Sequence, residues 1–146
     1  MTCYVNRYRG IENPFGHVWK NCDDVVSVYN NGYRTWYKCE DPSQFATNKN
    51  RAYKPICSRA IVTGHKSEIA ATINCDFFAE TCNGTSSTYW CDYNYDNDAT
   101  PEHCLLIGSN SGTVGMAGLF YLASDSGVSA FGTTICSRLT YLPWAE

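Results

Sequence analysis

The C-terminal stretch of residues 116–142, MAGLFYLASDSGVSAFGTTICSRLTYL, constrains the fold more than any other part of the chain. Residues 116–122 are apolar and aromatic, and residues 134–142 alternate between apolar and other side chains. A period of two with one apolar face is typical of a half-buried β-strand. Residues 123–133 lie between these two predicted strands and are almost all Ala, Ser, Gly, Asp and Thr, which favours a displayed loop over a core segment.

The length and the charge limit the possible classes of protein. A chain of 146 residues suits one domain, and the strand-like sequence that begins almost at once suggests a domain cut from the C-terminal part of a longer protein. With a net charge of −3 and no basic run, the chain lacks the electrostatic footprint of a nucleic-acid or membrane-surface binder. No apolar run approaches a bilayer span, and no signal peptide is visible at the N-terminus.

Nine cysteines are present, at positions 3, 22, 39, 57, 75, 82, 91, 104 and 136. Because the number is odd, they cannot all pair within the chain. Their spacing is irregular, and no signal peptide directs the protein to an oxidising compartment. We therefore expect mostly reduced, buried thiols that behave as small apolar residues, although one or two disulfides remain an alternative if the protein acts outside a cell.

Turn signals divide the remaining sequence into short elements. Asn31-Gly32 and Asn83-Gly84 each predict a β-hairpin. Pro14 and Pro42 each open a predicted short helix, the second with a capping residue at Asp41. The predicted strands are residues 25–29, 33–39, 59–63, 77–82, 86–92 and 103–107, with a polar loop at residues 93–101. The sequence thus predicts a β-rich α+β domain with short helices and long loops, and long loops tend to carry function.

Metal and catalytic sites are not expected. Residues 92–98 alternate oxygen-bearing side chains like the first half of a calcium loop, but Asn97 replaces the required Gly and His103 replaces the closing Glu. Turns stabilised by these side chains are the favoured interpretation. No Cys-x-x-Cys pair suggests zinc, and no Gly-x-Ser-x-Gly turn or local Cys–His signature suggests a nucleophile. We predict no cofactor, no metal and no catalytic residue.

Aromatic residues and the small-residue loop supply the binding hypothesis. We assign Trp19 and Trp36 to the core. Aromatics beside the polar loop, and small polar residues of the kind found in adaptable binding loops, are better candidates for a binding surface. The predicted ligand-binding residues are Tyr121, Ser124, Asp125, Ser126, Ser129, Thr133, Trp90, Tyr93 and Tyr95.

The two ends of the chain resemble a known family. The segment RGIENPFGHVW at residues 9–19 resembles the opening of domains in bacteriophage structural proteins and related gut-bacterial proteins. Those domains have the C-type-lectin-like fold in its formylglycine-generating-enzyme variant. Residues 108–111, residues 117–121 and the closing Ser137-Arg138-Leu139 are similar to the last strands of that fold. The resemblance implies a C-type-lectin-like domain whose C-terminal loops form the ligand-binding face.

For function, the resemblance implies a phage fibre or tail domain that attaches to a host-surface glycan or protein. Such a module would lie on a virion or a cell surface, as a homo-oligomer such as a trimer, beside other virion subunits. In some relatives a diversity-generating retroelement varies this C-terminal segment, so residues 123–133 would be the variable loop. Clustered substitutions there among sibling phages would support that hypothesis.

The sequence departs from the enzymes and calcium lectins of this family. Residues 108–122 match the segment where the oxidising enzymes carry a cysteine pair, and they contain no cysteine. The calcium-binding signatures Glu-Pro-Asn, Gln-Pro-Asp and Trp-Asn-Asp are also absent. We therefore expect a non-enzymatic binding module. A decoration protein packing on another subunit is one alternative, and a formylglycine-type oxidoreductase is a second.

Overall fold

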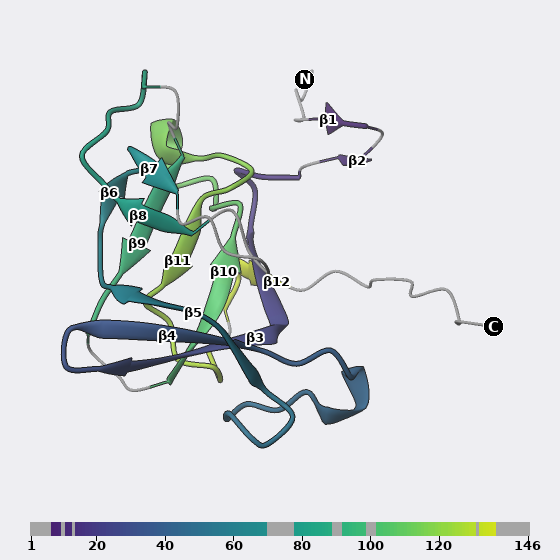
Figure 1. The fold of residues 1–146 in the computed structure, drawn as a ribbon. Coiled ribbons are helices and arrows are strands. Elements are labelled where there is room, and N and C mark those ends of the chain that lie inside the picture. The colour runs from purple at the N-terminus through teal and green to yellow at the C-terminus, as the bar shows by residue number, and fades with distance from the viewer. Residues whose placement is uncertain are drawn as a thin grey trace.

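The computed structural model describes residues 7–9, 11–12, 14–69, 78–88, 92–98, 102–130 and 132–136. The predicted α+β class is wrong, because strands make up 48% of the structure and only 5% is helical, in two 3₁₀ turns. The chain forms an all-β fold with a curled, half-barrel sheet (Figure 1). None of the helices in the described ranges is long and apolar enough to cross a membrane.

The strands are short, apart from the first strand of the main sheet. The two 3₁₀ turns are η1 (Pro42–Gln44) and η2 (Val114–Met116). The strands are β1 (Arg7–Tyr8), β2 (Ile11–Glu12), β3 (Trp19–Asn30), β4 (Tyr33–Lys38), β5 (Lys54–Ala60), β6 (Gly64–His65), β7 (Glu68–Ile69), β8 (Ala79–Thr81), β9 (Tyr93–Asp96), β10 (Glu102–Ile107), β11 (Leu122–Ser124) and β12 (Ile135–Cys136).

One eight-stranded sheet organises the domain. Seven of its strands lie in the order β5-β4-β3-β10-β11-β9-β6, and β12 is the eighth. β12 pairs with the start of β3 in parallel, and β11 pairs with β9 in parallel; the other neighbours are antiparallel. Two further pairs, β1-β2 and β7-β8, lie outside this sheet. Segments distant in sequence are therefore brought together at the centre, where β3, β10, β11 and β9 lie side by side (Figure 1).

The predicted hairpin around Asn31-Gly32 is confirmed. Asn30 of β3 pairs with Tyr33 of β4 next to the turn, and the pairing continues to Val25 and Lys38. The two turn residues, Asn31 and Gly32, have φ of 49° and 84°. Positive φ at both central positions is the geometry of the turn that matches the right-handed twist of the strands, and Asn-Gly favours it.

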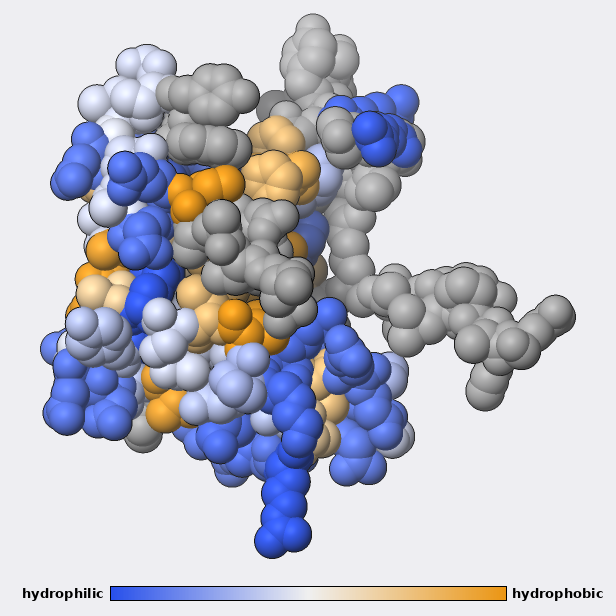
Figure 2. Space-filling view, viewed as in Figure 1, coloured by the Kyte–Doolittle hydropathy of each residue, from blue (hydrophilic) through white to orange (hydrophobic). Residues whose placement is uncertain are grey.

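The predicted helix at Pro42 is a single 3₁₀ turn. The Asp41 carboxylate accepts a hydrogen bond from the Ser43 amide at 2.9 Å, as expected of a helix cap. The turn ends at Phe45, which is already extended. Residues 40–51 are all exposed, so no apolar face is available whose burial would extend the helix. Figure 2 shows the hydrophilic surface that dominates the part of the molecule around the β4–β5 connection.

Other element predictions need correction. Residues 93–101 do not form only a loop, because they contain β9. Residues 116–122 are mostly a turn, and the strand there begins only at Leu122. The second predicted hairpin is also wrong: β8 pairs with β7, and the described residues 86–88 form a turn. Gly84 is needed instead for a close approach, since a Cβ there would lie 2.4 Å from the Lys66 carbonyl oxygen. Of the predicted strand at residues 134–142, only β12 lies within the described residues.

A large bulge bends β3. Cys104 pairs with Val26, but the next residue of β10, Leu105, pairs with Cys22. Residues 23–25 are therefore extra residues on the β3 side of this pair. Bulges bend the strand that carries them and increase its twist, which accounts for the curl of the sheet at this point.

The inner face of the curled sheet holds the main core. Trp36 and Phe78 stack there with ring centroids 4.8 Å apart, and both are essentially inaccessible to solvent. The remaining members of this cluster are Val25, Cys57, Leu105 and Leu122.

A polar cluster occupies the other half of the same inner face. Arg59 and Asp96 form an ion pair at 2.8 Å, with side chains only 4% and 1% exposed. The Asp96 carboxylate also accepts hydrogen bonds from the Ser124 hydroxyl and the Val62 amide. Asn94 links this pair to the neighbouring loop by donating to the Val62 carbonyl at 2.6 Å. These groups are stabilised by one another, because each would be costly to bury alone.

Arg34 and His103 extend the polar cluster across the sheet. Arg34 donates to the Ser27 hydroxyl at 3.0 Å and to the Asn97 carbonyl. His103 donates from Nδ1 to the Ser124 carbonyl, which can only accept, so this ring nitrogen carries a proton. Burial lowers the pKa of His103 below its ordinary value of 6.5, and the positive charge of Arg34 lowers it further.

The lowered pKa of His103 predicts a loss of stability in mild acid. Above pH 6.5 the ring is neutral in both the folded and the unfolded chain. As the pH falls below 6.5, the unfolded chain binds the proton first, so the free energy of unfolding decreases until the folded pKa is passed. In the His103→Asn variant, the amide keeps a hydrogen-bond donor near the Ser124 carbonyl but does not titrate. We expect the free energy of unfolding of this variant to decrease less between pH 8 and pH 5. Urea unfolding at a series of pH values measures the decrease. The exposed His17→Gln is the control, and an unchanged slope in His103→Asn would contradict the assignment.

Candidate ligand-binding face

The outer face of the sheet at β10, β11 and β9 carries a row of side chains fixed by register. Leu106 pairs with Ala123, and Ala123 pairs with Tyr95. Because side chains alternate along a strand, these three lie on the same side of the sheet, opposite to Asp96 and Ser124. We call this side the loop face, because the segment of residues 125–130 that follows β11 lies over it.

Packed aromatic rings form the floor of the loop face. The Tyr121 ring meets Trp19 edge-on at 4.8 Å between centroids, and it contacts the tilted ring of Tyr93 at 5.4 Å. Tyr93 in turn packs edge-on against His65. Burial raises the pKa of Tyr121 to about 12, and the neighbouring Tyr93 adds to the effect. The Tyr121 ring is thus buried among neighbouring rings.

A hollow of about 280 Å³ opens over this floor. We call it the aromatic hollow. Its walls combine aromatic rings with a carboxylate and two hydroxyls, and the residues are Trp19, Tyr95, Tyr121, Asp125, Ser126 and Thr134. Tyr95 is 39% exposed, so part of its surface is available to a ligand.

Backbone hydrogen bonds hold the loop of residues 125–130 against the sheet. The Cys104 amide donates to the Ser126 carbonyl at 3.1 Å, and His103 forms a bridge with Gly127. Asn97 donates to the Asp125 carbonyl at 3.5 Å. These contacts use main-chain atoms of the loop. The Asp125 carboxylate accepts a hydrogen bond from the Ser126 hydroxyl at 3.5 Å and is exposed at the edge of the aromatic hollow.

The predicted binding residues fall into three groups. Tyr95, Asp125 and Ser126 line the aromatic hollow, where Tyr121 supplies the buried floor, and Tyr93 packs against Tyr121 without lining the hollow. Ser129 and Thr133 are exposed but do not line the hollow, and Trp90 lies outside the described residues.

Ser124 does not belong to a ligand site on the loop face. It is fully buried on the inner face, where its hydroxyl donates to Asp96. The prediction failed because β11 continues through Ser124, so a residue expected at the start of a loop is instead the last residue of a central strand.

Sequence reasoning missed Trp19 and Thr134 as site residues. Trp19 was assigned to the core, yet it is only partly buried and borders the hollow. Trp19 pairs in parallel with Ile135, and this pairing brings Thr134, the residue before Ile135, to the site beside Trp19. The alternation of apolar and other side chains around Ile135 indicates a strand. The sequence does not indicate which other strand it pairs with.

No metal or thiol chemistry is apparent in the described part of the chain. Within those ranges, no group of three or more His, Cys, Asp or Glu side chains is arranged to hold a metal ion. Asn94 and Asp96, which suggested a calcium loop, instead bind the polar cluster of the inner face. The six described cysteines are free thiols, and burial raises the pKa of Cys104 to about 11. Such a thiol is a poor nucleophile at neutral pH.

Comparisons with known proteins give no relative from which a function could be transferred. No protein-family model, no curated protein and no solved structure matches this chain.

Proposed function

We propose that this chain is a non-enzymatic binding module that takes a saccharide in the aromatic hollow. The observation that carries the proposal is the convergence of an exposed ring, a carboxylate and two hydroxyls on one preformed hollow. Ligand sites are typically concave, with apolar walls and a few convergent polar groups.

The chemistry of these groups suits a ligand rich in hydroxyls. A sugar ring has an apolar face of C–H groups, which packs on an aromatic ring such as Tyr95. Its hydroxyls are donors, which the Asp125 carboxylate accepts, while Ser126 and Thr134 can donate or accept. None of the described residues lining the aromatic hollow is cationic, so a neutral sugar fits better than an acidic one.

The wider role that we propose is attachment to a host surface. The resemblance of residues 9–19 to bacteriophage proteins suggests a virion fibre or tail, and a displayed adhesin is the related possibility. Several copies in an oligomer would raise the avidity of a weak single site. The competing proposal, packing on another virion subunit, is favoured by an apolar hollow of about 410 Å³ beside Phe120, a ring that is 49% exposed.

The saccharide proposal predicts a loss of binding when Asp125 is changed. Hydrogen bonds to a charged group contribute about 1.5–3 kcal/mol, so Asp125→Asn should weaken sugar binding on the order of 10–100-fold. The measurement is binding of the purified chain to a panel of immobilised neutral glycans. The exposed Glu80→Gln, which makes the same charge change away from the hollow, should bind like the parent chain. Absence of binding to every glycan would reject the proposal.

A further inference from the structure

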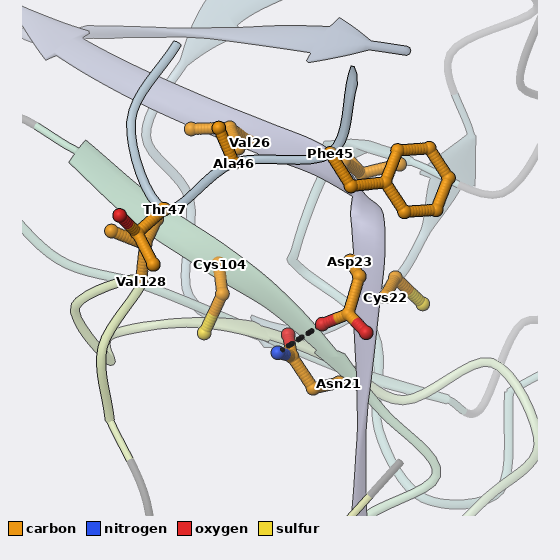
Figure 3. Close-up of a pocket in the computed structure, with 10 residues that line it drawn as sticks. Asn21, Cys22, Asp23, Val26, Phe45, Ala46, Thr47, Cys104 and Val128 are labelled. Carbon is orange, nitrogen blue, oxygen red and sulfur yellow. Dashed lines mark hydrogen bonds between the residues drawn. The ribbon is translucent and has the colours of Figure 1, made fainter. Parts of the chain in front are cut away.

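A second hollow of about 220 Å³ lies on the loop face (Figure 3). We call it the Asn21 hollow. It is bounded by the bulge of β3, by the segment that follows η1 and by the loop of residues 125–130. The lining residues used below are Asn21, Asp23, Phe45, Thr47, Cys104 and Val128.

The polar side of the Asn21 hollow is organised in advance. Asn21 Nδ2 donates to Asp23 Oδ1 at 2.8 Å, which fixes the carboxylate and leaves its second oxygen available (Figure 3). Asp23 is exposed, so this oxygen can accept hydrogen bonds from a ligand. Asp23 is the first of the extra residues of the bulge, and Asn21 lies two positions before it on β3, at the edge of the hollow.

The apolar side of the Asn21 hollow includes an exposed ring. Phe45 is 37% exposed and follows the 3₁₀ turn, whose capping bond holds the start of this segment. The next residue is also held, because the Ala46 amide donates to the Tyr53 hydroxyl at 3.1 Å. Hydrogen bonds therefore hold the backbone on both sides of Phe45. Cys22 and Cys104 also line the hollow as free thiols, and Figure 3 shows the Cys22 sulfur turned away from Cys104.

The two hollows are neighbours on the same side of the sheet. Cys104 lines the Asn21 hollow and Leu106 lines the aromatic hollow, and these residues are two positions apart on β10. At about 3.3 Å per residue, their Cα atoms are about 7 Å apart. The loop of residues 125–130 also contributes to both hollows, because Ser126 lines the aromatic hollow and Val128 lines the Asn21 hollow.

Each hollow repeats the same chemistry. In the aromatic hollow, Tyr95 and Asp125 provide an exposed ring and an exposed carboxylate, and in the Asn21 hollow Phe45 and Asp23 provide the same pair. No Lys, Arg or His is present among the described residues that line either hollow. Two carboxylates without a cation disfavour an anionic ligand, and their oxygens accept hydrogen bonds from the donor groups of a ligand.

We propose that the two hollows are adjacent subsites for one neutral oligosaccharide, whose chain passes over the loop of residues 125–130. This inference rests on the proposed function, because it takes the aromatic hollow as the first sugar subsite. It adds the length and the charge class of the ligand, and it assigns Asp23 and Phe45 to the second subsite.

The test compares ligands of different length on the full chain. The probes are glucose, galactose, mannose and N-acetylglucosamine, each as the monosaccharide and as the homotetrasaccharide, together with a sulfated tetrasaccharide, in calorimetric titrations. We expect one neutral tetrasaccharide to bind at least tenfold more tightly than its monosaccharide. Phe45→Ala should remove this gain. Phe120→Ala removes an exposed ring outside both hollows and should have no effect.

The outcomes separate this inference from the proposed function. If the monosaccharide binds and Asp125→Asn weakens it, but length gives no gain, the second subsite is rejected and the proposed function stands. A gain that survives both Phe45→Ala and Asp23→Asn also rejects the second subsite. Stronger binding of the sulfated tetrasaccharide rejects the neutral class, and failure of every sugar to bind rejects both proposals. Circular dichroism of each variant verifies that the fold is retained.

Discussion

Replacing Asp96 with asparagine is expected to lower the free energy of unfolding by about 3–5 kcal/mol, the usual result of breaking a buried ion pair by removing one partner. Asparagine has nearly the same shape, so the variant tests charge rather than packing. Asp96 is the carboxylate of the polar cluster, and it balances Arg59 directly at 2.8 Å. Its loss leaves the buried guanidinium groups of Arg59 and Arg34 without that negative charge.

Arg34 makes this effect larger than one lost contact. Burial lowers the pKa of the Arg34 guanidinium below its ordinary value, and the charge of Asp96 acts in the opposite direction. Without Asp96, less negative charge offsets the cost of burying the charged Arg34 side chain. The substitution therefore raises the free energy of the folded state through both Arg34 and Arg59.

Urea unfolding followed by intrinsic fluorescence measures the change for Asp96→Asn. The matched control is Asp98→Asn, which removes the same charge from an exposed position two residues later and should change stability by less than about 0.5 kcal/mol. Equal, small effects of the two variants would show that the Arg59–Asp96 pair contributes nothing specific to stability.

The parts of the fold that could be predicted from sequence are those with a local cause. The β3–β4 hairpin follows from Asn31-Gly32, whose two residues adopt positive φ. β10 follows from a short apolar run that ends at Gly108, a glycine with φ of 84°. In both cases the determining residues lie within or next to the element.

β9 could not be predicted because its inward side chains are polar. Asn94 and Asp96 face the inner side of the sheet, which reverses the usual alternation of apolar-in and polar-out. They are buried there only because Arg59, more than 30 positions earlier, supplies the partner charge. Such compensation between distant residues leaves no periodic signal, so the strand resembled a polar loop.

The sequence could indicate which types of residue form the candidate site, but it could not indicate how the fold arranges them. Asp125 and Ser126 belong to the small polar segment after β11 that the sequence analysis selected, and both line the aromatic hollow. The second subsite depends on the bulge at residues 23–25, and nothing in the local sequence distinguishes this bulge from regular strand.

Trp36→Ala is expected to destabilise the protein by about 3–5 kcal/mol, as other truncations of large buried aromatics do. Trp36 is 1% exposed and stacks on Phe78, so the substitution opens a cavity in the largest apolar cluster of the inner face. Unfolding measured by far-UV circular dichroism avoids dependence on the lost fluorophore. Tyr33→Ala on the same strand is the control, because that ring is 58% exposed and should contribute little.

Trp36→Phe separates the packing of this residue from its polarity. The indole Nε1 of Trp36 is buried without a hydrogen-bond partner among the described residues. An unsatisfied buried donor costs about 1–3 kcal/mol, and phenylalanine removes this donor while keeping an aromatic ring against Phe78. The lost contact area and the removed donor therefore act in opposite directions, and Trp36→Phe should be less than about half as destabilising as Trp36→Ala. If the two variants were equally destabilising, the indole N–H would have to be satisfied in the folded protein, and the ring would contribute more than its stacking on Phe78.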